Sequence, residues 1–271
     1  MKRITFTLLA LLLCIGGFAQ SHDSIYVYRG GNVVRSFLRS RVDSITYSKT
    51  GLDGKLYDDY VSQVIHLSGS SSILALSTID SLTFAKPKVY MQPEVVDLGL
   101  SVKWASFNVG ATAPEGYGSY FAWGETTEKT NYTWDTYKFY DATSQECADI
   151  GVVISGTQYD AAHTLLGNGW RMPTKEEVVE LLTICTPEWM TVNGVEGARL
   201  TAPNGKSIFL PAAGYRFEKE LKYTREYGRY WSGSVETSNT LFGVDIFFDS
   251  AQIKDLDSYR RNGFPIRAVK E

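Results

Sequence analysis

Residues 174–185 read TKEEVVELLTIC, and this stretch decides the predicted fold class because it carries the strongest helix signal in the chain. Thr174 occupies an N-cap position, and Glu177 three residues later completes the spacing of a capping box. Val178 and Leu181 recur on one face, and acidic residues fill the first turn. The stretch therefore predicts an amphipathic helix that buries one face.

Most of the sequence around this helix indicates short strands joined by long loops. The apolar residues of LFGVDIFFD, residues 241–249, alternate in the way expected of a strand with one buried face. Residues 159–166 give a second, shorter helix pattern. Few helices among many strands predict an α+β domain with short antiparallel strands and long loops.

The front of the chain contains an internal repeat. Residues 24–47 and 61–84 align without gaps, so that VDSITY at 42–47 matches IDSLTF at 79–84. Each copy predicts a hairpin followed by a short strand, which makes this region small and all-β. One hairpin cannot bury its own apolar face, so the two copies are expected to pack together.

Two prolines, Pro87 and Pro93, separate the repeats from the rest of the sequence. We expect a two-copy β-repeat region over residues 20–87 and one larger domain over residues 93–271. A domain of that length can bury a core of its own.

Residues 1–19 have the layout of a secretory signal peptide, with two cations before a short apolar run and small residues at its end. The run is too short to span a bilayer, which takes about 20 apolar residues, and no comparable stretch follows. The sequence thus predicts secretion and a mature chain without a transmembrane segment. Cys147 and Cys185 remain after cleavage, and a disulfide between them and two separate buried thiols are alternatives of equal weight.

Composition excludes some partners. Hydrophobic residues make up 44% of the chain and charged residues 21%, which is typical of a globular protein rather than a disordered one. The 27 Lys and Arg do not outnumber the 30 Asp and Glu, so a nucleic-acid partner is not expected.

The sequence contains no motif that predicts catalysis. HExxH, paired CxxC, EF-hand and G-x-S-x-G patterns are all absent. His163 is the one histidine of the larger domain that a Ser-His-Asp triad could use. Glu125 and Asp245 could be proposed as the acid and nucleophile of a glycoside hydrolase, but such a pair is weak evidence in a chain with 30 acidic residues. We therefore expect no enzyme activity, no catalytic residue, no transition-metal site and no cofactor. Calcium remains an alternative, because loop carboxylates can bind it without a short motif, here Asp245, Asp249, Asp255 and Asp257.

Aromatic residues gather in the polar segment KTNYTWDTYKFYDATSQ, residues 129–145, where neither helix nor strand periodicity explains them. Exposed rings can stack on sugar rings while neighbouring polar groups bind hydroxyls. The candidate ligand-binding residues are Tyr132, Trp134, Tyr137 and Tyr140. The alternative is that these rings only stabilise a long loop.

Several blocks of the larger domain resemble the Fibrobacter succinogenes major paralogous domain over residues 94–270. They include VDLGLSVKWASFNVGA at 96–111, YGSYFAWGET at 117–126, YDAAHTLLGNGWRMPTKEEVVELL at 159–182 and GFPIRAVK at 263–270. The resemblance implies a C-type-lectin-like fold, in its formylglycine-generating-enzyme version, on secreted or surface proteins of Gram-negative gut-type bacteria. It implies no particular activity, because the roles of such domains are mostly undefined.

The chain departs from that family at its cysteines. Phe107 stands where many relatives have Cys, so a bridge from that position is excluded. No cysteine follows Cys185, so the oxidative chemistry of the enzyme that lends the fold its name does not carry over.

Together these observations predict a secreted, periplasmic or outer-surface binding module that is non-catalytic and recognises a glycan or a surface protein, as in adhesion. The repeats would serve as a spacer. The alternative is a structural or assembly component of the envelope or of a surface appendage, with subunit contacts made by exposed strand edges.

Overall fold

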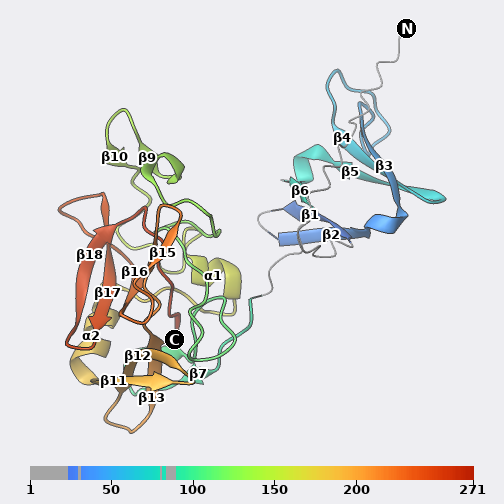
Figure 1. Ribbon diagram of the computed structural model, residues 1–271. Coiled ribbons are helices and arrows are strands. Elements are labelled where there is room, and N and C mark those ends of the chain that lie inside the picture. The colour runs from blue at the N-terminus through green and yellow to red at the C-terminus, as the bar shows by residue number, and fades with distance from the viewer. Residues whose placement is uncertain (1–23, 30–31, 80, 84–89) are drawn as a thin grey trace. The chain divides into compact units, whose positions relative to one another are not determined.

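The computed structural model describes residues 24–29, 32–79, 81–83 and 90–271 (Figure 1). The predicted signal peptide, residues 1–19, lies outside them. The chain divides into two compact units, Met1–Lys88 and Val89–Glu271. In the described part of the chain, no helix has the length and apolar character needed to cross a membrane.

In the first unit, both sequence copies form a hairpin, one turn of 3-10 helix and a third strand. The elements are β1 (Ser24–Arg29), β2 (Asn32–Leu38), η1 (Arg39–Arg41) and β3 (Val42–Ser48), then β4 (Ser62–Leu67), β5 (Ser70–Ala75), η2 (Leu76–Thr78) and β6 (Ser81–Thr83). The same order of elements in both copies follows from their matching apolar and turn residues.

The two copies exchange their third strands. β6 of the second copy pairs with β1, and β3 of the first copy pairs with β4, which makes two sheets in the orders β2-β1-β6 and β3-β4-β5. Val27 and Ile65 are fully buried beside Leu74 in their shared core. Each sheet thus needs a strand from the other copy, which gives the doubled sequence a structural reason.

The second unit contains two helices and many short strands. The strands are β7 (Val95–Val96), β8 (Lys103–Ala105), β9 (Tyr140–Asp141), β10 (Glu146–Cys147), β11 (Thr186–Val192), β12 (Val195–Thr201), β13 (Ser207–Pro211), β14 (Tyr215–Phe217), β15 (Glu220–Lys222), β16 (Tyr227–Val235), β17 (Phe242–Asp249), β18 (Ile253–Tyr259) and β19 (Val269–Lys270). They form small sheets ordered β16-β17-β18, β11-β12-β13, β19-β8-β7, β14-β15 and β10-β9.

The helix predicted from TKEEVVELLTIC is confirmed as α2 (Lys175–Ile184), with Thr174 and Glu177 forming the capping box. Val178 and Leu181 are fully buried and share a core with residues of β16 and β17. The β16-β17-β18 sheet has α2 beside one of its ends (Figure 1). The second helix, α1 (Ala161–Leu166), is capped by Asp160, whose carboxylate accepts the His163 N–H.

The predicted α+β class, with its C-type-lectin-like arrangement, is wrong. The described residues are 43% extended and 11% helical, in small separate sheets without a closed barrel. Part of the difference lies in a hairpin, β11 and β12, that is absent from the sequence prediction. Its turn, Asn193-Gly194, has both φ angles positive (48° and 80°), as a tight two-residue turn requires. Residues without a strand pattern in the sequence thus pair as strands, whereas within the described ranges α1 and α2 are the only α-helices.

A buried arginine joins the ends of the second unit. Arg267 donates to the carbonyls of Ala105, Ser106 and Phe209 and to Oδ1 of Asn108, with its Nε–Oδ1 bond 2.9 Å long. All of these acceptors come from loops or strands far from residue 267 in sequence. Arg267 is therefore a structural cross-link rather than an anion-binding residue.

Candidate functional site

The aromatic segment of residues 129–145 has two buried rings. Tyr132 and Tyr137 are 1% and 3% exposed. Their hydroxyls donate to the carbonyls of Tyr120 and Trp123, each at 2.7 Å. Both rings therefore hold the loop to the core, and the prediction that they contact a ligand is corrected.

Arg260 holds the hydroxyl group of Tyr137 in place. Its Nε donates to the Tyr137 hydroxyl at 2.9 Å, and its guanidinium lies 4.4 Å from the centre of the Trp123 ring. Burial raises the pKa of Tyr137 far above its usual value, so the phenol stays neutral. The loop thus rests on a rigid base of hydrogen bonds and cation–π contacts.

The other two predicted rings lie at the surface. Trp134 and Tyr140 are half-buried, and their rings stack with centroids 4.7 Å apart. Trp134 also meets Tyr259 edge to face at 5.5 Å. These rings stay candidates for ligand contact.

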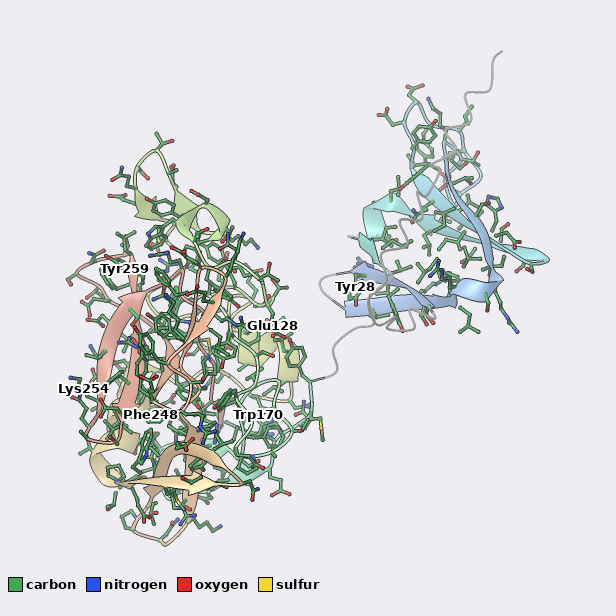
Figure 2. All side chains as sticks on the ribbon, viewed as in Figure 1. Tyr28, Glu128, Trp170, Phe248, Lys254 and Tyr259 are labelled. Carbon is green, nitrogen blue, oxygen red and sulfur yellow. The ribbon has the colours of Figure 1, made fainter. Side chains whose placement is uncertain are left out.

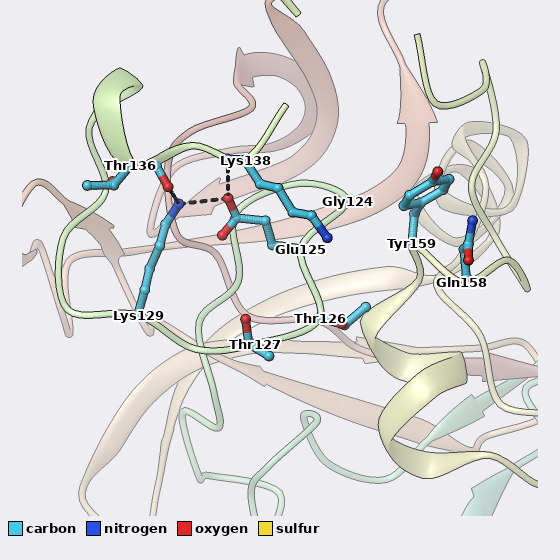
Figure 3. A pocket seen from close by; sticks show the side chains of 9 residues that line it. All are labelled: Gly124, Glu125, Thr126, Thr127, Lys129, Thr136, Lys138, Gln158 and Tyr159. Carbon is cyan, nitrogen blue, oxygen red and sulfur yellow. Dashed lines mark hydrogen bonds and ion pairs between the residues drawn. The ribbon is translucent and has the colours of Figure 1, made fainter. Parts of the chain in front are cut away.

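An open pocket of about 510 Å³ lies beside the same loop (Figure 3). We call it the Glu125 pocket, and its lining consists of Gly124, Glu125, Thr126, Thr127, Lys129, Thr136, Lys138, Gln158 and Tyr159. The loop contributes Lys129, which precedes the predicted rings, and Thr136 and Lys138, which lie between them. The sequence prediction named only rings as candidate residues and assigned hydroxyl binding to neighbouring polar groups in general, so the two lysines were not singled out.

A tight turn positions Glu125. The N–H of Glu125 donates to the Ala122 carbonyl at 3.0 Å, and Gly124 between them has a φ of +80°. A Cβ at Gly124 would lie 2.6 Å from Cδ1 of Ile150, so only glycine fits there. The turn directs the Glu125 side chain to the pocket floor.

One oxygen of the Glu125 carboxylate is fully engaged. Glu125 is 8% exposed, and its Oε1 accepts from Nζ of Lys129 and from the backbone N–H of Lys138, each at 2.9 Å. Lys129 also donates to the Thr136 carbonyl at 3.0 Å and lies over the Tyr137 ring. Glu125 and Lys129 thus form a fixed ion pair that shapes one wall.

Two polar groups in the pocket can bind a ligand, although the Lys138 ammonium also lies 5.5 Å from the centre of the Phe139 ring. Among the described residues, neither the Glu125 Oε2 atom nor the Lys138 ammonium has a hydrogen-bond or ion-pair partner. The Lys138 side chain extends into the space between Glu125 and Tyr159 (Figure 3). The half-buried Tyr159 ring stands edge-on to Phe139 at 5.5 Å. The pocket therefore offers an acceptor, a cationic donor and an aromatic surface.

Residues considered for catalysis do not meet in this pocket. Glu125 is the one carboxylate in its lining, whereas glycoside hydrolysis ordinarily uses two. Asp245 is buried in β17, where both its oxygens face Arg229, the nearer at 3.1 Å. His163 is exposed on α1 and is no part of the lining.

The four aspartates considered as calcium ligands do not form a site. In the described part of the chain, no group of three or more His, Cys, Asp or Glu side chains could hold a metal ion. Asp245 is committed to Arg229, and Asp249 caps the turn to β18 by accepting the N–H groups of Ala251 and Gln252.

The two cysteines are free and buried, so the alternative of separate thiols describes this structure and the considered disulfide is not formed. Cys147 packs in the cluster around Tyr132, whereas Cys185 packs beside Val178 in the core under α2. Burial raises the pKa of both thiols. Neither is an activated nucleophile.

No family model, curated protein or solved structure matches this chain. The resemblance to the Fibrobacter succinogenes major paralogous domain therefore stays a prediction from the sequence. Function has to be argued from the site itself.

Proposed function

We propose that this protein is a non-catalytic binding module that recognises a glycan in the Glu125 pocket. One observation carries the proposal. Glu125 Oε2 and the Lys138 ammonium have no hydrogen-bond or ion-pair partner among the described residues, and they line the same pocket as the Tyr159 ring. An ion pair and a tight turn hold Glu125 in place before any ligand arrives. Such preorganisation lowers the cost of binding.

Sugar chemistry matches this set of groups. A sugar hydroxyl both donates and accepts, so neighbouring hydroxyls can donate to Glu125 and accept from Lys138. Thr126, Thr127 and Gln158 supply further polar groups at the rim. The apolar face of a sugar ring can pack on the Tyr159 ring. The pocket lining carries two lysines and one glutamate, so a weakly acidic sugar fits as well as a neutral one.

The expected affinity is low. A monosaccharide has about 12 non-hydrogen atoms, and at about −0.3 kcal/mol per atom it would gain about −4 kcal/mol. That free energy corresponds to a Kd of about 1 mM. Multivalent presentation is therefore needed to see binding in a screen, because avidity multiplies weak contacts.

A glycan array with the purified protein, followed by calorimetric titration of the best ligand, tests the proposal. Lys138→Ala should weaken binding about tenfold or more, because a hydrogen bond to a charged group contributes about 1.5–3 kcal/mol. Lys206→Ala is the matched control, since Lys206 is an exposed lysine outside the pocket. Equal affinity of both variants for every array ligand would contradict the proposal, provided that their thermal melts match the wild type.

The proposed setting is the cell surface or the extracellular space of a Gram-negative bacterium. It is supported by the signal-peptide layout of residues 1–19 and by the family resemblance of residues 94–270. In this proposal the first unit serves as a spacer between the cell surface and the unit that contains the pocket. Cell fractionation with an antibody against the protein would test the setting, and retention in the cytoplasm would contradict it.

A second candidate function is assembly, and the edge strands of the first unit favour it. β2 and β5 are edges of their sheets, and they expose Val33, Val34, Leu38 and Ile73 by 38–52%. Unpaired apolar edges promote strand pairing between molecules. Analytical ultracentrifugation should then show self-association that Val34→Lys abolishes. A monomer at every concentration would argue against this function.

A further inference from the structure

A row of aromatic rings crosses the surface of the second unit, away from the Glu125 pocket lining. Tyr140 stacks on Trp134 at 4.7 Å, Trp134 meets Tyr259 at 5.5 Å, and Tyr259 stacks on Phe242 at 4.5 Å. Figure 2 shows Tyr259 at the end of β18 nearer the β9–β10 hairpin, opposite Lys254. We call these four rings the aromatic row.

The row ends in a second pocket of about 240 Å³. Phe242 and Tyr259 from the row line it together with Tyr227, and its polar lining includes Arg229, Ser258 and Asn262. No residue of this pocket belongs to the Glu125 pocket. The two are therefore separate sites on one unit.

Polar atoms in this second pocket lack partners. Asn262 is 9% exposed, and its Oδ1 is buried without a hydrogen bond in the described structure. Among the described residues, Arg229 makes hydrogen bonds through Nη1 alone, to Asp245 and to the Ser258 hydroxyl, and its guanidinium also lies over the Phe247 and Phe264 rings. A buried amide without a partner is unfavourable, so a ligand hydroxyl that pairs with it has a driving force to enter.

Charge in the pocket points to an uncharged ligand. The Arg229 guanidinium is paired with the buried Asp245 carboxylate, and the exposed Asp257 adds a negative charge to the lining. With Asp257 in it, the lining carries no net positive charge to attract an anionic ligand, and a cationic ligand would meet Arg229. Outside this lining, the Arg261 guanidinium lies over the Trp134 and Tyr259 rings, 5.3 and 5.7 Å from their centres. Rings beside neutral polar atoms fit a polyhydroxylated ring.

We propose that this second pocket and the aromatic row form a further carbohydrate site. The pocket holds one neutral sugar ring against the stacked pair of Phe242 and Tyr259, and Asn262 pairs with one of its hydroxyls. The next sugars of an oligosaccharide lie across Trp134 and Tyr140. This inference goes beyond the proposed function, because it needs no residue of the Glu125 pocket and makes the unit bivalent for glycans.

NMR of the ¹⁵N-labelled full chain tests this site, because the Trp134 indole N–H reports on the row. Trp134→Phe identifies its signal among the six tryptophans. Soluble oligomers of β-glucose, xylose, mannose and N-acetylglucosamine serve as neutral probes, and oligogalacturonate serves as the charged one. At least one neutral probe should shift the signal, and longer oligomers should bind more tightly than single sugars.

Variants separate this site from the Glu125 pocket. Tyr259→Ala should weaken the titration about tenfold or more, Tyr259→Phe should preserve it, and Asn262→Leu should weaken it while keeping the rings. Tyr57→Ala, at a similarly exposed tyrosine of the first unit, is the control and should change nothing. Lys138→Ala should leave the Trp134 titration unchanged even where it abolishes binding in the Glu125 pocket.

Three results would overturn the proposal. The first is that no neutral probe moves the Trp134 signal of the wild type. The second is that only oligogalacturonate moves it. The third is that Tyr259→Ala and Asn262→Leu, folded by the same spectra, both titrate as the wild type does. None of these results bears on Lys138, so a failure here is distinct from a failure of the Glu125 pocket.

Discussion

The buried carboxylate of Asp245 should make the stability of the second unit fall as pH rises. Asp245 has no exposed surface, and its two oxygens lie 3.1 and 3.4 Å from Nη1 of Arg229. Burial raises the pKa of Asp245 from 3.8 to about 7, although Arg229 and Ser258 oppose the rise. In the unfolded chain the carboxyl returns to its ordinary pKa.

The direction of this pH dependence follows from the number of protons that the folded and unfolded states bind. Between about pH 4 and pH 7 the folded state holds the Asp245 proton and the unfolded state has lost it. The folded state therefore gains stability at low pH, and the gain disappears as pH rises through the folded pKa. A rise of about 3 pKa units at 1.36 kcal/mol per unit corresponds to about 4 kcal/mol over that window.

Chemical denaturation from pH 4.5 to 8, followed by tryptophan fluorescence, measures this effect. All six tryptophans lie in the second unit, so the signal reports on that unit alone. Asp245→Asn keeps an acceptor for Arg229 and cannot titrate, which makes it the reference. The free energy of unfolding of the wild type, minus that of Asp245→Asn, should decrease by up to about 3 kcal/mol between pH 4.5 and pH 8.

A difference that does not change with pH would refute the reasoning, because it would mean that Asp245 has an ordinary pKa in the folded state. A difference that increases with pH would refute it more strongly. It would show that attraction to Arg229 outweighs burial and lowers the pKa. The other ionisable side chains are the same in both proteins, so their contributions cancel in the comparison.

Three further predictions concern the support of the site and the core. Tyr137→Phe removes the hydroxyl shared by Trp123 and Arg260 and should lower the free energy of unfolding by about 1–3 kcal/mol in urea titrations; an unchanged midpoint would contradict it. Thr174→Ala removes the α2 N-cap and should destabilise the second unit by about 1 kcal/mol, while Thr174→Ser should restore most of that. Cys147 and Cys185 should react with a thiol reagent only after denaturation, and rapid labelling of either cysteine in the native protein would count against their burial.

The candidate site was only partly predictable from the sequence. The sequence singles out the segment at residues 129–145 by its rings, and Trp134 and Tyr140 lie half-buried at the surface. Tyr132 and Tyr137 in the same segment are buried, and their hydroxyls donate to the buried carbonyls of Tyr120 and Trp123. Ring type alone does not distinguish these cases, since a tyrosine can serve a core and a surface equally well.

The sequence by itself determined what depends on neighbours a few residues apart. The capping box of α2 joins residues 174 and 177, and the repeat hairpins close over a few residues each, so their patterns can be read directly. Only the tertiary structure decided the strand exchange between the repeats, the union of residues 124–138 with Gln158 and Tyr159 in one pocket, and the burial of Arg260 under Tyr137. These features rest on contacts between residues far apart in the chain, and burial is a property of the packed whole that no local pattern encodes.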